Sequence, residues 1–145
     1  MTVKEYLSNS LKIDDRIQRK KQNLEDLRLL ATNISQTISD MPGSGNKNLS
    51  KLEDIMIKIA DLERELELEI LSQTALKIEI NILIDRVEND SEQQVLYERY
   101  VKNKPFDEIA LSMNYHKRHI YRLHDNAIDR LEKKRQEKQD VTLVC

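Results

Sequence analysis

The chain has 145 residues, of which 39% are hydrophobic and 34% are charged, with two Gly, two Pro, one Cys, no Trp and a formal net charge of −2. So few turn-forming residues argue against β-sandwiches and barrels, which need a turn every ~8–12 residues, and the one Cys, Cys145, excludes an internal disulfide framework. Because no apolar stretch reaches ~18 residues and no signal-peptide hydrophobic region follows Met1, we expect an all-α protein of the cytoplasm without a membrane span.

The charge is unevenly distributed along the chain. Residues 1–90 hold 13 basic and 17 acidic residues, whereas residues 91–145 hold 11 basic and 9 acidic residues and all three His. A basic C-terminal part is typical of proteins that bind an anionic partner, although a solvated helix face has the same composition.

The first ninety residues are expected to form a long antiparallel coiled-coil helical hairpin. Thr2 and Glu5 can form a capping box at the start of the first helix. Pro42, Gly43 and their neighbours interrupt the pattern, so a loop is expected at 40–50, with Asn48 or Ser50 capping the second helix. The first helix has a seam with alternating spacings of four and three, typical of a coiled coil: Tyr6, Ser10, Ile13, Ile17, Lys20, Leu24, Leu27, Ala31, Ile34, Ile38 and Met41.

The second helix has a seam of the same kind, and folding it back predicts a register. Ile38 then lies opposite Ile55, and Ile13 opposite Ile80, while Lys20 lies near Gln73 and within a turn of Glu69. A shared polar layer of this kind fixes the register of a coiled coil. The second seam consists of Leu52, Ile55, Ile59, Leu62, Leu66, Glu69, Gln73, Leu76, Ile80, Leu83 and Val87.

Residues 75–84 also alternate with period two, so a strand is the alternative to a helix there. In a helix, Ile78, Ile82 and Ile84 fall outside the narrow seam and must pack on the C-terminal domain or on another subunit. This surplus apolar surface predicts a homo-oligomer.

The C-terminal third has the spacing of a helix-turn-helix that begins at Phe106. Asn89–Ser91 ends the long helix and can cap the next one, which precedes the motif. Asn103–Pro105 then separates that helix from the motif. Ala110 stands where two helices cross, and Asn114 stands in the turn, where positive φ is needed. The expected core and turn positions are Ile109, Ala110, Met113, Asn114, Tyr115, Ile120 and Leu123. A plain three-helix protein-binding bundle is the alternative.

The second helix of this motif is expected to start near His116 and to present its N-terminal half to the major groove of DNA. Five of the seven residues 116–122 are basic or His, and such side chains contact guanine edges and phosphates. The expected DNA-binding residues are His116, Lys117, Arg118, His119, Tyr121 and Arg122.

The segments 92–100, 106–110 and 121–131 resemble region four of bacterial sigma factors, which reads the promoter −35 element. Residues 5–133 as a whole resemble a family of small phage and prophage regulators, related to the RinA and ArpU late-gene activators. The resemblance implies a sequence-specific regulator of transcription in a bacterial host cell, an activator of late genes, with promoter or operator DNA and RNA polymerase as partners. Asn114 replaces the usual Gly, His116 the usual Ser or Thr and Arg118 an acidic residue, so a −35-like target does not follow.

We therefore expect a hairpin over 1–90, a helix-turn-helix domain over 91–135 and a C-terminal tail over 136–145. His116 and His119 could chelate zinc, but no third ligand has a suitable spacing, so neither a metal nor another cofactor is expected. Paired carboxylates lack a His or metal partner, so no enzyme is expected. The alternative function is a protein–protein interaction module that uses the hairpin and does not bind specific DNA.

Overall fold

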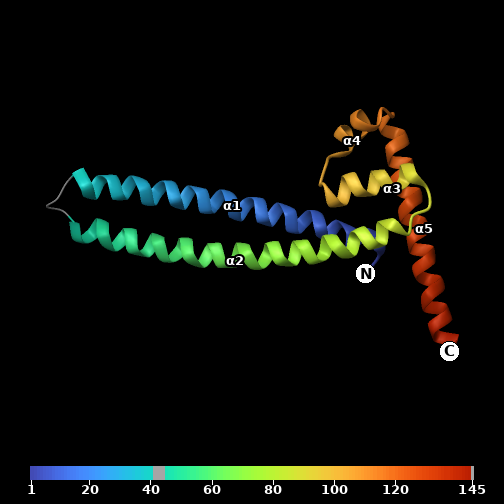
Figure 1. Ribbon diagram of the computed structural model, residues 1–145, viewed down its shortest axis with the longest axis horizontal. Helices are drawn as coiled ribbons and strands as arrows, with labels where there is room; N and C mark the ends of the chain where they lie inside the picture. Colours follow the sequence, from blue (N-terminus) through green and yellow to red (C-terminus); the bar gives the residue numbers. More distant parts are fainter. Residues whose placement is uncertain (41–44, 145) are drawn as a thin grey trace. The chain divides into compact units, whose positions relative to one another are not determined.

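The computed structural model describes residues 1–40 and 45–144, and over these residues the protein is helical without a strand (Figure 1). The expected loop residues Pro42 and Gly43, the seam residue Met41, and Cys145 lie outside the described residues. Residues 75–84 are helical, so the alternative of a strand there is wrong. None of the described helices has the length and apolar character needed to cross a membrane. The elements are α1 (Val3–Asp40), α2 (Gly45–Asp85), α3 (Asp90–Leu96), the π-helix η1 (Tyr97–Val101), α4 (Phe106–Met113) and α5 (Lys117–Val144).

Local capping sets two of the helix starts. At the start of α1, the Thr2 N–H donates to Glu5 Oε2 at 3.2 Å and the Glu5 N–H donates to Thr2 Oγ1 at 3.1 Å, which is the expected capping box. At the start of α3, the Asn89 side chain accepts the Glu92 N–H at 3.0 Å, as expected. The expectation for α2 is wrong, because α2 begins at Gly45, before Asn48 and Ser50.

The chain divides into two compact units. Unit 1 contains Met1–Asp14 and Gln73–Cys145, and unit 2 contains Asp15–Ser72. The start of α1 and the end of α2 therefore belong to the same unit as the C-terminal helices. This division differs from the one expected at residue 90. Of the expected tail over 136–145, residues 136–144 belong to α5, which continues to Val144.

In unit 2, α1 and α2 are joined by ion pairs that run in opposite directions along the two sequences. Arg28 Nη2 lies 2.9 Å from Glu63 Oε1, and Lys20 Nζ lies 3.0 Å from Glu69 Oε1, as the expected polar layer requires. Six apolar seam positions of this unit are buried, and the other apolar ones are partly exposed. The buried ones are Ile17, Leu24, Ala31, Ile55, Ile59 and Leu66. Gln73, which was expected near Lys20, instead donates to the buried Asp14 in unit 1.

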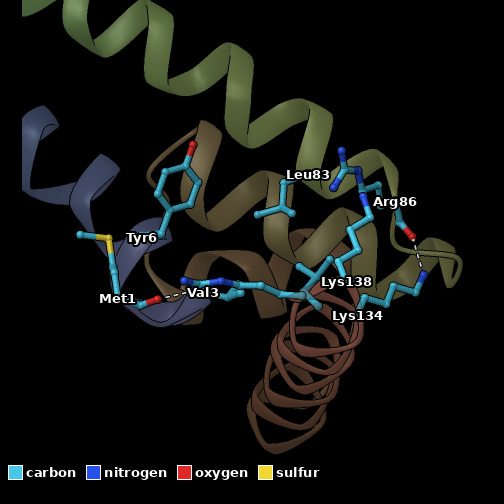
Figure 2. A pocket seen from close by; sticks show the side chains of 9 residues that line it. Met1, Val3, Tyr6, Leu83, Arg86, Lys134 and Lys138 are labelled. Carbon is cyan, nitrogen blue, oxygen red and sulfur yellow. Dashed lines mark hydrogen bonds between the residues drawn. The ribbon is translucent and has the colours of Figure 1, made fainter. Parts of the chain in front are cut away.

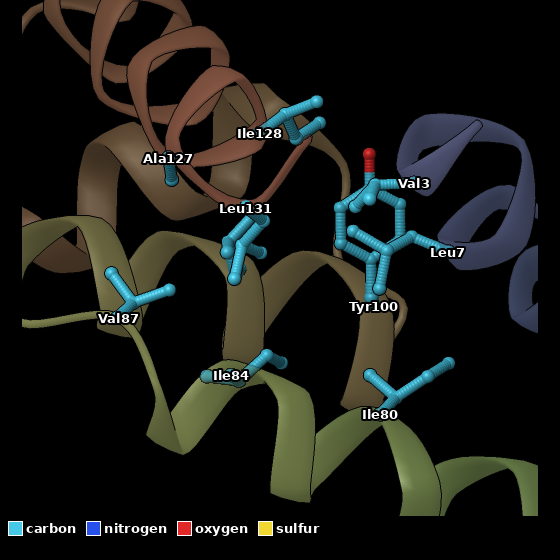
Figure 3. Packing of buried hydrophobic residues seen from close by; sticks show 10 residues of the cluster. Val3, Leu7, Ile80, Ile84, Val87, Tyr100, Ala127, Ile128 and Leu131 are labelled. Carbon is cyan, nitrogen blue, oxygen red and sulfur yellow. The ribbon is translucent and has the colours of Figure 1, made fainter. Parts of the chain in front are cut away.

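Unit 1 has a core in which the start of α1 and the end of α2 pack on α5 (Figure 3). Leu7 of α1 and Ile80 of α2 are fully buried in it together with Leu131 of α5. Ile84 is 2% exposed in the same core. Of the three isoleucines outside the seam, this one therefore packs on the C-terminal helices, which was one of the two expected alternatives. Ile78 and Ile82 remain 58% and 54% exposed.

Ion pairs and hydrogen bonds hold α3 and η1 in unit 1. Glu92 is 2% exposed, and its Oε2 accepts a hydrogen bond from Arg130 Nη1 of α5 at 3.0 Å. The Ser10 hydroxyl of α1 donates to the Tyr100 carbonyl of η1 at 2.9 Å. A hydrogen bond from Lys104 Nζ and the charges of Lys102 and Lys104 lower the pKa of the buried Glu98 carboxyl, so it stays ionised at neutral pH.

The connection between α4 and α5 is a tight turn with a left-handed residue. Asn114 has φ 57° and ψ 43°, as expected, and the Tyr115 N–H donates to the Ala110 carbonyl at 3.0 Å. This is a Schellman arrangement, which satisfies the last carbonyls of α4. The core beneath it contains Val95, Ile109, Ala110, Ile120 and Leu123, with Phe106 and Met113 partly buried against it.

The expectation that Tyr115 lies in this core is wrong, because its side chain is 41% exposed. Its ring lies edge-on against His119, with the ring centroids 4.8 Å apart. The backbone of Tyr115 completes the turn, and its side chain is left on the surface beside the first turn of α5.

A buried polar network links η1 to α5. His124 is 4% exposed, its Nε2 lies 2.6 Å from the Tyr100 hydroxyl, and its Nδ1 lies 3.0 Å from Asp125 Oδ1. Burial raises the pKa of Tyr100 to about 12, so the phenol keeps its proton and donates to Nε2. Burial lowers the pKa of His124 below 6.5, against the opposing effect of Asp125 and with the help of Lys4 and Arg99.

Substitution of Asn114 should reveal the cost of the left-handed turn. Asn114→Ala is expected to lower the free energy of unfolding by about 1 kcal/mol, because a Cβ without a local polar group disfavours this conformation. Asn114→Gly should keep or raise stability. Urea denaturation measures the difference, and Asn126→Ala, on the exposed face of α5, is a control that should cause no loss. Equal stability of Asn114→Ala and the parent would contradict the assignment.

Burial of His124 predicts acid sensitivity. Because its pKa is lower in the folded protein than in the unfolded chain, the unfolded chain binds more protons below pH ~6.5. The free energy of unfolding should therefore be highest above that pH and fall as the pH decreases towards the lowered pKa, by at most about 1.4 kcal/mol per pH unit. His124→Gln should flatten this dependence in denaturation curves at pH 5–7, whereas the half-exposed His119→Gln should keep it. An unchanged slope in His124→Gln would contradict this account.

Candidate nucleic-acid interface

Five of the six expected DNA-binding residues lie on the first turns of α5, and the sixth, His116, directly precedes this helix after the Asn114 turn. The His116 carbonyl accepts the N–H groups of His119 and Ile120 at 2.9 and 3.1 Å, which fixes the start of the helix. Ile120 and Leu123 face the core and are 0% and 8% exposed. Five of the six residues are exposed and His119 is half-buried, so the surface-facing half of this segment carries them all.

Four of the six residues line one shallow groove, which we call the His/Arg groove. Its volume is about 440 Å³, and its lining consists of His116, Arg118, His119 and Arg122. Arg118 and Arg122 are one helical turn apart and have no ion-pair partner among the described residues. With two guanidinium groups and no carboxylate in its lining, the groove attracts anions and presents planar donors suited to phosphates and guanine edges.

Lys117 and Tyr121 face α4 instead of the groove. Lys117 Nζ lies 2.5 Å from Asp107 Oδ1, and the Tyr121 ring lies 4.8 Å from the Phe106 ring. The hydrogen bond and the charge of Asp107 raise the pKa of the Lys117 ammonium, so it remains charged. These contacts join the start of α5 to the start of α4, and they leave Lys117 less available for an external partner than the two arginines.

Residues outside the expected set also shape this surface. Asp107 anchors Lys117, and the guanidinium carbon of Arg99 from η1 lies 4.5 Å from the centre of the Phe106 ring. Phe106 lies edge-on to the buried His124, with the ring centroids 5.2 Å apart. Asp107 was not among the expected site residues, because its partner Lys117 is ten residues away in the sequence and on another helix.

His116 and His119 belong to no candidate metal site: among the side chains that the structure describes, no group of three from His, Cys, Asp or Glu could hold a metal ion. His119 instead contacts the Tyr115 ring.

Comparison with known proteins gives a family for this chain. Nothing among curated proteins or solved structures matches it. The family DUF1492, described as a protein of unknown function, matches residues 30–132, which include the end of α1, all of α2, α3, η1 and α4, and the first half of α5. Because this match covers well over half of the residues, the chain belongs to the DUF1492 family.

Proposed function

We propose that this protein is a sequence-specific DNA-binding regulator of transcription that inserts the N-terminal half of α5 into the major groove. The observation that carries this proposal is the His/Arg groove, where Arg118 and Arg122 are exposed and unpaired among the described residues. Arginine donates two hydrogen bonds to guanine O6 and N7, which is the commonest specific contact to DNA.

The geometry around the groove supports assigning α4 and α5 to a helix-turn-helix. The left-handed Asn114, the packing of Ala110 between the helices and the Lys117–Asp107 ion pair together hold α5 rigidly against α4. A recognition helix needs such support, because base contacts require side chains to be held in place before binding. Resemblance to sigma region four and to the RinA and ArpU activators adds that the targets are promoters or operators of phage or prophage late genes.

We further propose that α1 and α2 form an antiparallel coiled-coil hairpin through which the protein self-associates or engages RNA polymerase. The buried seam and the ion pairs from Lys20 and Arg28 support the hairpin. Exposed Ile78 and Ile82 support self-association, because side chains of this kind are normally covered by a partner when they are adjacent. A dimer would also supply the second recognition helix that most helix-turn-helix proteins use.

A second function is favoured by a different observation. In unit 2, α2 exposes three large apolar side chains, Ile57, Leu68 and Leu71, each by about 60% or more. A protein–protein interaction module that grips a partner with this helix, without specific DNA binding, would explain them. Binding measurements with DNA distinguish the two functions.

Loss of both groove arginines should abolish sequence preference. A preferred site is first selected from random-sequence duplexes, and binding is then measured by fluorescence anisotropy. Arg118→Ala/Arg122→Ala should lose about 1–3 kcal/mol for each specific base contact, and much less on random duplex. Neither side chain contacts the core, so the variant should remain folded by circular dichroism. If no site is enriched, or if the double variant keeps its preference, DNA recognition by α5 is wrong.

Lys133 gives a matched control for the loss of positive charge. It is exposed on α5, about three turns beyond Arg122, and can reach only phosphate. Lys133→Ala should weaken binding to all duplexes equally and lower the salt slope by at most about one unit. Selective loss of the preferred site in this variant would contradict the assignment of base reading to the groove.

Self-association is tested at the exposed isoleucines. Ile78→Glu/Ile82→Glu should shift the protein to the 17.1 kDa monomer in sedimentation equilibrium, because two buried charges would destabilise an interface. Both side chains are exposed, so helicity should not change. Gln18→Glu/Gln36→Glu adds the same charge at exposed positions of α1 and should leave association unchanged. A parent protein that is already monomeric at tens of micromolar would overturn the proposal.

A further inference from the structure

Unit 1 contains a second hollow, far along α5 from the His/Arg groove. Its volume is about 480 Å³, and it lies between the first turn of α1, the last turns of α2 and the C-terminal half of α5 (Figure 2). This volume is within the range of small-molecule sites, which is about 300–1,000 Å³. We call it the basic pocket, and it is lined by Met1, Val3, Tyr6, Leu83, Arg86, Leu131, Lys134, Arg135 and Lys138.

The floor of the basic pocket is apolar. Val3 and Leu131 are 4% and 3% exposed at its base, and Leu83 is half-buried beside them. The Tyr6 ring forms one wall, and its hydroxyl donates to Glu79 Oε2 at 2.7 Å. Burial and the bond to Glu79 raise the pKa of Tyr6 to about 12, so the phenol adds no negative charge to the wall.

Four cationic side chains surround this floor: Arg86, directly after α2, and Lys134, Arg135 and Lys138 from α5. Two of them hold the walls together. Lys134 Nζ donates to the Arg86 carbonyl at 3.2 Å, and Arg135 Nη1 donates to the Met1 carbonyl. Arg86 and Lys138 are exposed, and Figure 2 shows the Lys138 side chain extending from α5 towards Arg86.

Two carboxylates near the pocket contact residues that line it. Glu132 Oε2 accepts the Val3 N–H at 2.7 Å, and Glu88 Oε1 lies 3.9 Å from Lys134 Nζ. Neither Glu lines the pocket, whose charged lining residues are all basic. The pocket therefore has an apolar floor and a positively charged rim. Water or a simple salt ion can contact the charges but cannot cover the apolar floor.

We propose that the basic pocket binds a small amphipathic anion, namely an alkyl carboxylate of the fatty-acid type. The alkyl chain would cover Val3, Leu83 and Leu131, which removes apolar surface from water. The carboxylate would accept hydrogen bonds from Arg86 and Lys138, and charge-assisted bonds of this kind are stronger than neutral ones. Binding of such an anion is independent of whether the other end of α5 binds DNA.

The test uses the full-length ¹⁵N-labelled chain and three probes: octanoate, 1-octanol and inorganic phosphate. Octanoate should cause saturable shifts of the amide resonances of Val3, Leu83 and Leu131. 1-Octanol, which lacks the charge, should bind about tenfold more weakly, and phosphate should cause no saturable shifts at these amides.

Removal of the two exposed cations makes the test specific. Arg86→Gln/Lys138→Gln should weaken octanoate binding by about tenfold or more and leave 1-octanol binding unchanged. Lys51→Gln/Lys58→Gln removes the same charge from exposed positions of α2 in unit 2 and should leave octanoate binding unchanged. All the side chains replaced in these variants are exposed, and circular dichroism checks that the fold is kept.

Three outcomes would overturn the proposal. A lack of octanoate-induced shifts at these amides would show that the pocket does not bind an alkyl carboxylate. Equal binding of octanoate and 1-octanol, unaffected by the double variant, would show an apolar hollow without anion recognition. Phosphate binding as tight as that of octanoate would show an anion site that makes no use of the apolar floor.

Discussion

The buried face of α5 is the constraint on which unit 1 depends. The same helix packs Ile120 and Leu123 under the α4 turn and, one to two turns later, packs Ala127 and Leu131 against the ends of α1 and α2. Two apolar clusters thus share one rigid element. Because a helix is rigid along its length, the contacts on the buried face of α5 determine which of its residues lie on the exposed face.

Polar groups buried along this helix add directional contacts to that packing. Glu92 accepts a hydrogen bond from Arg130, and His124 bridges the Tyr100 hydroxyl and the Asp125 carboxylate. Hydrogen bonds are directional whereas apolar contacts are not, so the Tyr100–His124 and Glu92–Arg130 bonds select one rotation of α5 about its axis. That rotation places Arg118 and Arg122 on the surface.

The two proposed sites have related electrostatics and different shapes. At the N-terminal end of α5, two arginines and two histidines line a groove without an apolar floor, which suits a polar, extended polyanion. At the other end, cations surround buried Val3 and Leu131, which suits an anion with an apolar chain. The difference arises because α5 lies at the surface beside a short turn at one end and contacts two long helices at the other.

Local rules determined much of this protein directly from its sequence. The alternating spacing of four and three identified two long helices, Thr2 and Asn89 predicted caps, and Asn114 predicted a left-handed turn. Each of these features depends on hydrogen bonds or sterics within a few residues of the chain, so the order of residues is sufficient to predict them. The clustering of His and Arg at 116–122 was visible for the same reason.

Contacts between distant residues were decided only by the tertiary structure. Periodicity could not tell that Ile84 is buried while Ile78 and Ile82 are exposed, because all three fall outside the narrow seam and only the position of α5 separates them. Likewise Lys117 is bound by Asp107 of another helix, and the basic pocket brings together Arg86 and Lys138, which are far apart in the sequence. Helical spacing determines which residues share a face, but packing determines which face is covered and which side chains from different helices meet.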